Sequence, residues 1–400
     1  MKYARVFVIA VVSLLFQPIP AAAQTPSTSS TEKTTVEKTA LEALFRRGPK
    51  SLEYTQQMHD AISMERLENI VASIEDQLGT FVDVENEKNP YTLTFTNGEA
   101  TAVIVLNNRG EVAGLQFTQL IPRTGSLEEA IDAFLDRPGE TALTVLRDGE
   151  AFAGGGTDRP LAVGSSFKLA VLKALEDAVA AGRTSWNEVL TLDDRDRSLP
   201  SGVMQSWPAG SAVTVETAAI LMISQSDNTA TDVLIRHVGR NAVEAYTPDS
   251  LPLLTTREAF VLKADAQAAV RKRFLASSVR GRREILADME GELPSTGLFA
   301  GDPVHPEIEW FFTTEQLARL IAGIDRKDIL GINPGPISAE AWKEYGYKGG
   351  SEPGVFNATL FLATPEGRTY SISASQNRTD ADVDAAGFFS ALQAIMTHLW

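Results

Sequence analysis

The chain has 400 residues, and its hydrophobic (44%) and charged (22%) fractions are those of a globular protein with room for two domains. This excludes a wholly disordered chain, a collagen-like fibre and a multi-span membrane protein, and the net charge of −16 argues against nucleic acid or an anionic membrane as a partner. Cysteine is absent, which excludes disulfides, thiolate nucleophiles and Cys-ligated metals, and no two of the four histidines are spaced like a metal-binding pair. No metal or cofactor is therefore predicted.

Residues 1–23 have the layout of a secretory signal peptide. Lys2 and Arg5 give a positive start, a short apolar run follows, and Ala21-Ala22-Ala23 supplies small residues for cleavage. The apolar run is too short to span a bilayer, although an uncleaved anchor is the alternative. We expect a periplasmic or secreted protein with no stable membrane anchor, in which the Ser/Thr-rich residues 24–35 form a flexible tether.

Residues 36–122 predict a small α+β domain. Apolar residues recur at helical spacing between residues 41 and 74. Alternating runs typical of strands follow at 81–84, 91–95, 101–106 and 112–120, with turn signals between them. Helices followed by an antiparallel meander are the expected order of elements.

Residues 126–400 predict a second α+β or α/β domain, an antiparallel sheet flanked by helices with a helical subdomain. Ser126 is a good N-cap for a helix that reaches Leu135. Strands are expected at 141–146 and 151–153, then at 345–349, 358–364 and 369–374, with a mainly helical section between the two groups and a closing helix over 384–399. Strands from both ends of this region would form one sheet.

One candidate nucleophile lies at the start of an apolar helical run. Ser165 and Lys168 are three residues apart, so a helix would place both side chains on one face. A serine in the first turn lies where free N–H groups favour negative charge, and a lysine of depressed pKa can serve as its base. The alternative is an N-cap serine beside a surface lysine.

Two further motifs follow in chain order. Ser226-Asp227-Asn228 separates two apolar helical runs, and by itself could be a helix cap with an Asx-turn. Lys348-Gly349-Gly350-Ser351 ends an expected strand, where paired glycines allow a close backbone approach or simply a turn.

The three motifs together are far more specific than any one. The ordered set Ser-x-x-Lys, Ser-Asp-Asn and Lys-(Thr/Ser)-Gly is the signature of penicillin-recognising serine enzymes. Residues 126–400 resemble that superfamily, and within it the class A β-lactamase-like serine hydrolases.

The resemblance implies a role for each residue. Ser165 would be the acylated nucleophile, Lys168 its general base, and Ser226 a proton relay to the leaving group. Asn228 would bind the amide of the substrate side chain, and Lys348 would hold a substrate carboxylate. The backbone after Gly350, at Ser351, would complete an oxyanion hole with Ser165.

The sequence departs from the class A pattern at two places. The third motif reads Lys-Gly-Gly, with Ser351 just beyond it as a substitute hydroxyl. The Glu-x-x-Leu-Asn segment that supplies the class A deacylation base is missing, and Glu258 is the one acid near its expected position. The other interpretation of Glu258 is that it pairs with Arg257 or caps a helix.

The leading hypothesis is an exported serine hydrolase that forms an acyl-enzyme on Ser165, with a β-lactam, a peptidoglycan-like peptide or an ester as substrate. The alternatives are a slow esterase or D,D-peptidase that deacylates poorly, and a non-catalytic sensor of β-lactam or peptidoglycan. The helices-then-sheet order of residues 36–122 resembles the nuclear-transport-factor-2-like fold. Joined to a serine hydrolase domain, it resembles a β-lactamase-like family associated with clavulanic acid biosynthesis.

Overall fold

The computed structural model describes residues 30–85, 89–123, 125–337 and 339–399, so the predicted signal peptide lies outside the described residues. Contacts divide the chain into two compact units. One unit combines residues 1–130 with Asp384–Trp400, and the other is Ile131–Val383. Within the described ranges, no helix has the length and apolar content needed to cross a membrane.

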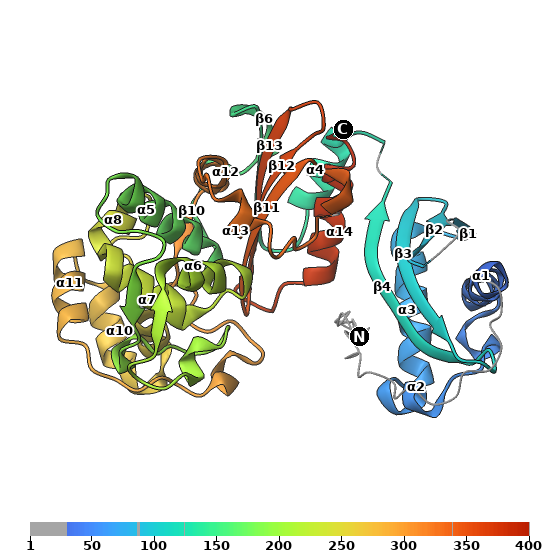
Figure 1. The fold of residues 1–400 in the computed structure, drawn as a ribbon, viewed down its shortest axis with the longest axis horizontal. Coiled ribbons are helices and arrows are strands. Elements are labelled where there is room, and N and C mark those ends of the chain that lie inside the picture. Colours follow the sequence, from blue (N-terminus) through green and yellow to red (C-terminus); the bar gives the residue numbers. More distant parts are fainter. Residues whose placement is uncertain (1–29, 86–88, 124, 338, 400) are drawn as a thin grey trace. The chain divides into compact units, whose positions relative to one another are not determined.

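The first unit has the predicted order of helices followed by an antiparallel meander (Figure 1). Its elements are α1 (Ser30–Arg47), η1 (Pro49–Ser51), α2 (Gln56–Ala61), α3 (Met64–Leu78), β1 (Phe81–Glu85), β2 (Tyr91–Phe95), β3 (Gly98–Leu106) and β4 (Val112–Pro122). The strands pair in the order β1-β2-β3-β4. Phe45 of α1 packs against Phe81 and Phe95 of the sheet, with ring centroids 5.3 and 5.2 Å away, so this unit has a core of its own.

The predicted tether over 24–35 is wrong for its second half, because α1 already begins at Ser30. Residues 24–29 lie outside the described residues. The polar start of α1 gives little apolar periodicity, which is why the sequence did not reveal it. A tertiary contact holds the helix just after this segment, since the buried Glu37 accepts a hydrogen bond of 2.8 Å from the Tyr91 hydroxyl on β2.

The closing helix α14 (Ala385–Met396) forms where it was predicted, with Asp384 as its N-cap. The contacts group it with the first unit, where it packs against β4, whereas the sequence assigned it to the domain of residues 126–400. Its apolar residues predict a buried helix, but they do not say which surface buries it.

The second unit holds a five-stranded antiparallel sheet of order β11-β12-β13-β5-β6. Its strands are β5 (Glu140–Arg147), β6 (Glu150–Gly155), β11 (Glu344–Glu352), β12 (Val355–Ala363) and β13 (Thr369–Asn377), so segments far apart in sequence share one sheet, as predicted. Helix α12 (Thr314–Ala322) packs on β5, β12 and β13 (Figure 1).

The helical part of this unit lies between the two groups of strands in the sequence. Its helices are α5 (Lys168–Ala180), α6 (Val215–Ser224), α7 (Asn228–Val238), α8 (Arg240–Glu244), α9 (Thr256–Lys263), α10 (Ala268–Leu275), α11 (Val279–Ala287) and α13 (Lys327–Leu330). Helices α5, α6 and α7 contact one another in one large apolar core, and α4 (Leu127–Leu135) precedes the sheet with Ser126 as its N-cap. The edge strand β11 packs against the short helix η2 (Gly164–Phe167), which leads into α5.

Candidate active site

Ser165 lies in η2, directly before the buried helix α5. The turn is anchored from behind, because the Val163 N–H donates to the carbonyl oxygen of Trp310 at 3.0 Å. The rings of Phe167 and Trp310 are stacked with centroids 4.1 Å apart. These contacts hold the turn against the core and leave Ser165 partly exposed while its neighbours are buried.

Lys168 is fully buried, which contradicts the alternative of a surface lysine. Its Nζ lies 2.5 Å from the Ser226 carbonyl oxygen, 3.2 Å from Ser226 Oγ and 2.6 Å from Asn228 Oδ1. Burial and the nearby charge of Lys348 lower the pKa of Lys168 well below its usual range. The buried amine is therefore biased toward its neutral, proton-accepting form.

The loop between α6 and α7 presents Ser226 in an unusual backbone conformation. Ser226 has φ 55°, a left-handed conformation that is costly outside glycine. The buried Asp227 stabilises it by capping α7 through the Ala230 N–H and by accepting from the N–H groups of Val203 and Met204 at 2.6 and 2.8 Å. The cap expected of this motif therefore coexists with a strained serine at the site.

Lys348 lies on β11 and also contacts Ser226. Its Nζ lies 3.0 Å from Ser226 Oγ and 2.5 Å from the Gly349 carbonyl oxygen. Burial lowers the pKa of Lys348 to about 7. The Ser226 hydroxyl thus lies between two buried amines, an arrangement suited to passing a proton from one to the other.

Gly350 lets the backbone of β11 approach the nucleophile turn. A Cβ at this position would lie 2.0 Å from the Val163 carbonyl oxygen and 2.6 Å from the backbone nitrogens of Ser165 and Ser166. A Cβ on Gly164, in the nucleophile turn, would lie 3.0 Å from the Ser351 nitrogen. The backbone of β11 at Gly350 and Ser351 thus runs close to the nucleophile turn at Gly164 and Ser165.

Asn228 and Lys168 make contacts that differ from those their expected roles require. Asn228 is buried, and its amide is engaged inside the protein by Lys168 and by the Leu199 carbonyl oxygen at 2.9 Å, so it positions Lys168 in this state. In the described part of the chain, no hydrogen bond joins Ser165 Oγ to Lys168, whose donors point to Ser226 and Asn228.

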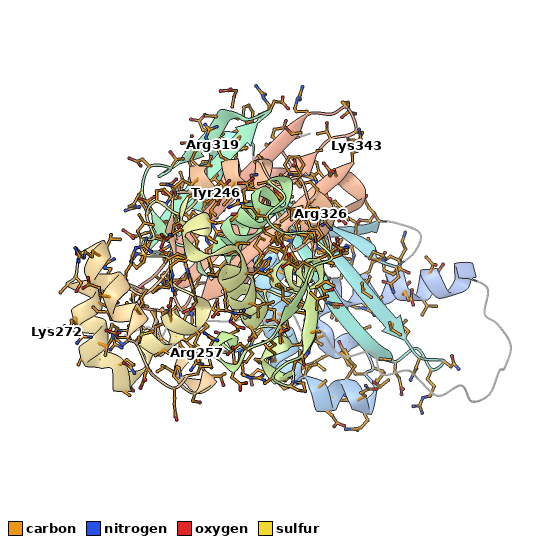
Figure 2. All side chains as sticks on the ribbon, turned by 60° about the vertical axis from the view of Figure 1, so that its left-hand side comes forward. Tyr246, Arg257, Lys272, Arg319, Arg326 and Lys343 are labelled. Atoms are coloured by element: carbon orange, nitrogen blue, oxygen red, sulfur yellow. The ribbon has the colours of Figure 1, made fainter. Side chains whose placement is uncertain are left out.

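Glu258 is bound elsewhere. Arg240 donates to both of its carboxylate oxygens, at 2.6 and 2.9 Å, and the Thr255 N–H donates to Oε2 in a capping box at the start of α9. Arg257, labelled in Figure 2, donates instead to the carbonyl oxygens of Arg197 and Gly291. The structure therefore agrees with the interpretation of Glu258 as a helix cap. Its ion-pair partner is Arg240 on helix α8, however, and not the predicted Arg257.

The structure also places a buried charged cluster beside the site that the sequence analysis did not single out. Lys263, at the end of α9, contacts the carboxylates of Glu309 and Glu352. The one sequence signal was that Glu352 directly follows the third motif. Neither Lys263 nor Glu309 is near a motif, so their pairing follows only from the packing.

The low pKa of Lys348 makes stability depend on pH. Above about pH 7 the folded protein has lost this proton, whereas the unfolded lysine keeps it up to about pH 10. The unfolded state then binds more protons, so this group makes the free energy of unfolding rise with pH in that window, by at most about 1.4 kcal/mol per pH unit. We expect Lys348→Met to reduce the rise between pH 7 and pH 10.

Urea denaturation of the full chain at several pH values measures this effect. Other groups titrate in the same range, notably Glu309, so the informative quantity is the difference between the variant and the wild type. Lys343→Met changes an exposed lysine just before β11 and serves as the control (Figure 2). Equal pH dependence in Lys348→Met and wild type would contradict the assignment of a depressed pKa to Lys348.

Comparison with known protein families gives a match for part of the chain. Residues 126–283 match the sequence model described as the beta-lactamase enzyme family. No curated protein matches the chain.

Several solved structures are similar at low identity. A beta-lactamase from Sphaerobacter thermophilus DSM 20745 is 23% identical, with a TM-score of 0.48 over 68% of this chain and 94% of that one. The structure of PBP-A is 17% identical, with a TM-score of 0.47 over 70% and 98%. A class A beta-lactamase from Bacteroides cellulosilyticus DSM 14838 is 17% identical, with a TM-score of 0.47 over 67% and 95%. Residues 126–283, which include the first two motifs, thus match the beta-lactamase enzyme family, and the third motif at Lys348 lies against Ser226 in the same unit.

Proposed function

We propose that the protein is an exported serine hydrolase that forms an acyl-enzyme on Ser165 and hydrolyses a β-lactam or a related amide. The observation that carries the proposal is the Ser226 hydroxyl, which lies 3.2 Å from Lys168 Nζ and 3.0 Å from Lys348 Nζ beside the nucleophile turn. Such a constellation has no evident use in a structural domain, because burying two lysines is costly.

Each group has a step in the proposed reaction. The neutral amine of Lys168 takes the proton of Ser165 as Oγ attacks the carbonyl carbon. The Ser165 and Ser351 N–H groups stabilise the oxyanion. Ser226 then delivers a proton to the leaving nitrogen, and Lys348, when protonated, attracts a substrate carboxylate despite the overall charge of −16.

Export rests on the charged and apolar pattern of residues 1–23. Expression of the full chain in a Gram-negative host, followed by N-terminal sequencing of the periplasmic fraction, tests it. A mature protein that starts at Gln24 supports export. Retention of all of the protein in the cytoplasm with Met1 intact contradicts it.

The acyl-enzyme is tested by intact-mass spectrometry of the full chain mixed with penicillin G and with a cephalosporin, followed over time. We expect a mass increase of one substrate that clears with release of the hydrolysed product, and no increase in Ser165→Ala. The absence of an adduct and of product with both probes would contradict the proposal.

A persistent adduct would favour the second candidate, a penicillin-binding D,D-peptidase or slow esterase. The specific observation in its favour is that Arg240 and Thr255 occupy the carboxylate of Glu258, the acid nearest to the expected deacylation base. Peptidoglycan-like peptides and activated esters would then be the substrates to test next.

A further inference from the structure

Two glutamates and one lysine form a buried cluster in the second unit. Lys263 contacts Glu309 Oε1 and Glu352 Oε2, and the exposed fractions of the three side chains are 1%, 0% and 13%. The elements that supply them are the end of α9, the segment before β10 (Phe311–Phe312) and the end of β11. Burial of three ionisable groups is expensive, so an arrangement of this kind calls for an explanation.

The cluster has one cation for two acids. Burial and the charge of Glu352 raise the pKa of Glu309 to about 8, so Glu309 keeps its proton near neutral pH. Its Oε2 has no hydrogen-bond partner among the described residues. Glu352 contacts the same lysine and is more accessible than the other two.

The cluster lies beside the nucleophile turn. Alternate residues of a strand share a face, so Glu352 is on the same face of β11 as Gly350, which packs against the backbone of Ser165, and as Lys348. The charge of Glu352 reaches Lys168, where it opposes the lowering of the lysine pKa. Glu309 directly precedes Trp310, the ring stacked on Phe167.

From this placement we infer that Glu352 is the general base that activates water for hydrolysis of the acyl-enzyme, with Lys263 and Glu309 as its positioning residues. The inference rests on the proposed acyl-enzyme and supplies a base for the step from which Glu258 is withheld by its pairing with Arg240. Lys263 holds Oε2 of Glu352, and a carboxylate fixed at one oxygen and partly open to solvent can accept a proton at the other.

The step balances without a further reactant. Glu352 takes one proton from water as the water oxygen bonds to the acyl carbon. The tetrahedral intermediate collapses, the bond between the acyl carbon and Ser165 Oγ breaks, and the proton returns to Oγ. The products are the free acid, the serine hydroxyl and the ionised carboxylate of Glu352.

The test compares wild type, Glu352→Gln and a control by rapid-quench mass spectrometry with penicillin G. The control is Glu344→Gln, which neutralises an exposed glutamate at the other end of the same strand. We expect Glu352→Gln to acylate at the wild-type rate but to keep its adduct about 100-fold longer, the lower range for loss of a general base. Glu344→Gln should match the wild type in both rates.

Two added measurements separate a base from a structural role. Hydroxylamine, a strong nucleophile that needs little base assistance, should shorten the adduct lifetime in Glu352→Gln by a larger factor than in wild type. Glu352→Asp should give an intermediate lifetime, and it also serves if the glutamine variant does not fold. Loss of acylation together with deacylation, with no effect of hydroxylamine, would overturn the inference in favour of a structural role.

The outcomes distinguish this inference from the proposed function. An adduct that clears equally fast in wild type and Glu352→Gln overturns the role of Glu352 and leaves the acyl-enzyme intact. An adduct that persists in the wild type also overturns the role of Glu352, because no base then works, and it too leaves the acyl-enzyme intact. Absence of any adduct in the wild type overturns both.

Discussion

Lys168→Ala is expected to lower the rate of acylation by penicillin G by about 10⁴-fold, near the upper range for loss of a general base. In the proposed reaction the buried amine takes the proton of Ser165, and in the structure it contacts Ser226 and Asn228. Its loss leaves the buried Asn228 Oδ1 without its donor, so we also expect a destabilisation of about 1–3 kcal/mol. Intact-mass kinetics and urea denaturation measure the two effects.

The matched control is Lys173→Ala on the same helix, because Lys173 is partly exposed and pairs with Asp177 at 2.5 Å. It should leave acylation unchanged. Lys168→Ala also separates an enzyme from a sensor, since a binding protein has no need of a buried amine. Wild-type acylation by Lys168→Ala would contradict the role of Lys168 as base. If Lys168→Ala binds the ligand as tightly as the wild type does, and the wild type forms no adduct, the sensor is favoured.

Gly350→Ala should reduce acylation by about 10²–10³-fold, the effect of losing one oxyanion-hole donor. The added Cβ would lie 2.0 Å from the Val163 carbonyl oxygen and 2.6 Å from the Ser165 nitrogen, so β11 and η2 must move apart. Both neighbours are backbone atoms and cannot rotate away. Overpacking of this kind also costs about 1–3 kcal/mol of stability.

The control for this prediction is Gly114→Ala, a strand glycine whose Cβ would meet Val105 at an ordinary 3.7 Å. Acylation rates and urea denaturation curves of the two variants should differ sharply, with Gly114→Ala close to wild type. Full acylation activity in Gly350→Ala would show that the contact between β11 and η2 is not needed for the oxyanion hole.

Local patterns in the sequence predicted most of the secondary structure. The alternating run 91–95 became β2 with the same ends, and the run 81–84 became β1 with one more residue. Ser126 caps α4 as expected. These features depend on side-chain periodicity and on turn and cap chemistry within a few residues, which a single sequence displays directly. The start of α1 was missed because its residues are polar, and a contact that holds the helix at Glu37 comes from Tyr91, 54 residues away.

For the candidate site, too, the sequence indicated the residues but not how they are arranged. The order and spacing of the three motifs sufficed to single out Ser165, Lys168, Ser226 and Lys348, because the chemistry of an acyl-transfer site restricts its residue types. Their geometry did not follow from the motifs. The placement of Ser226 Oγ between two amines depends on how β11 packs against η2 and on the strained loop held by Asp227.

By itself, the sequence determined the class of the elements, the two-part organisation and the residue types of the site. Only the tertiary structure decided which charges pair. Glu258 binds Arg240 rather than its neighbour Arg257, and Lys263 joins Glu309 and Glu352, which lie 46 and 89 residues away. The physical reason is that periodicity and capping act over a few residues, whereas the partner of a buried charge depends on which helices and strands the core brings together.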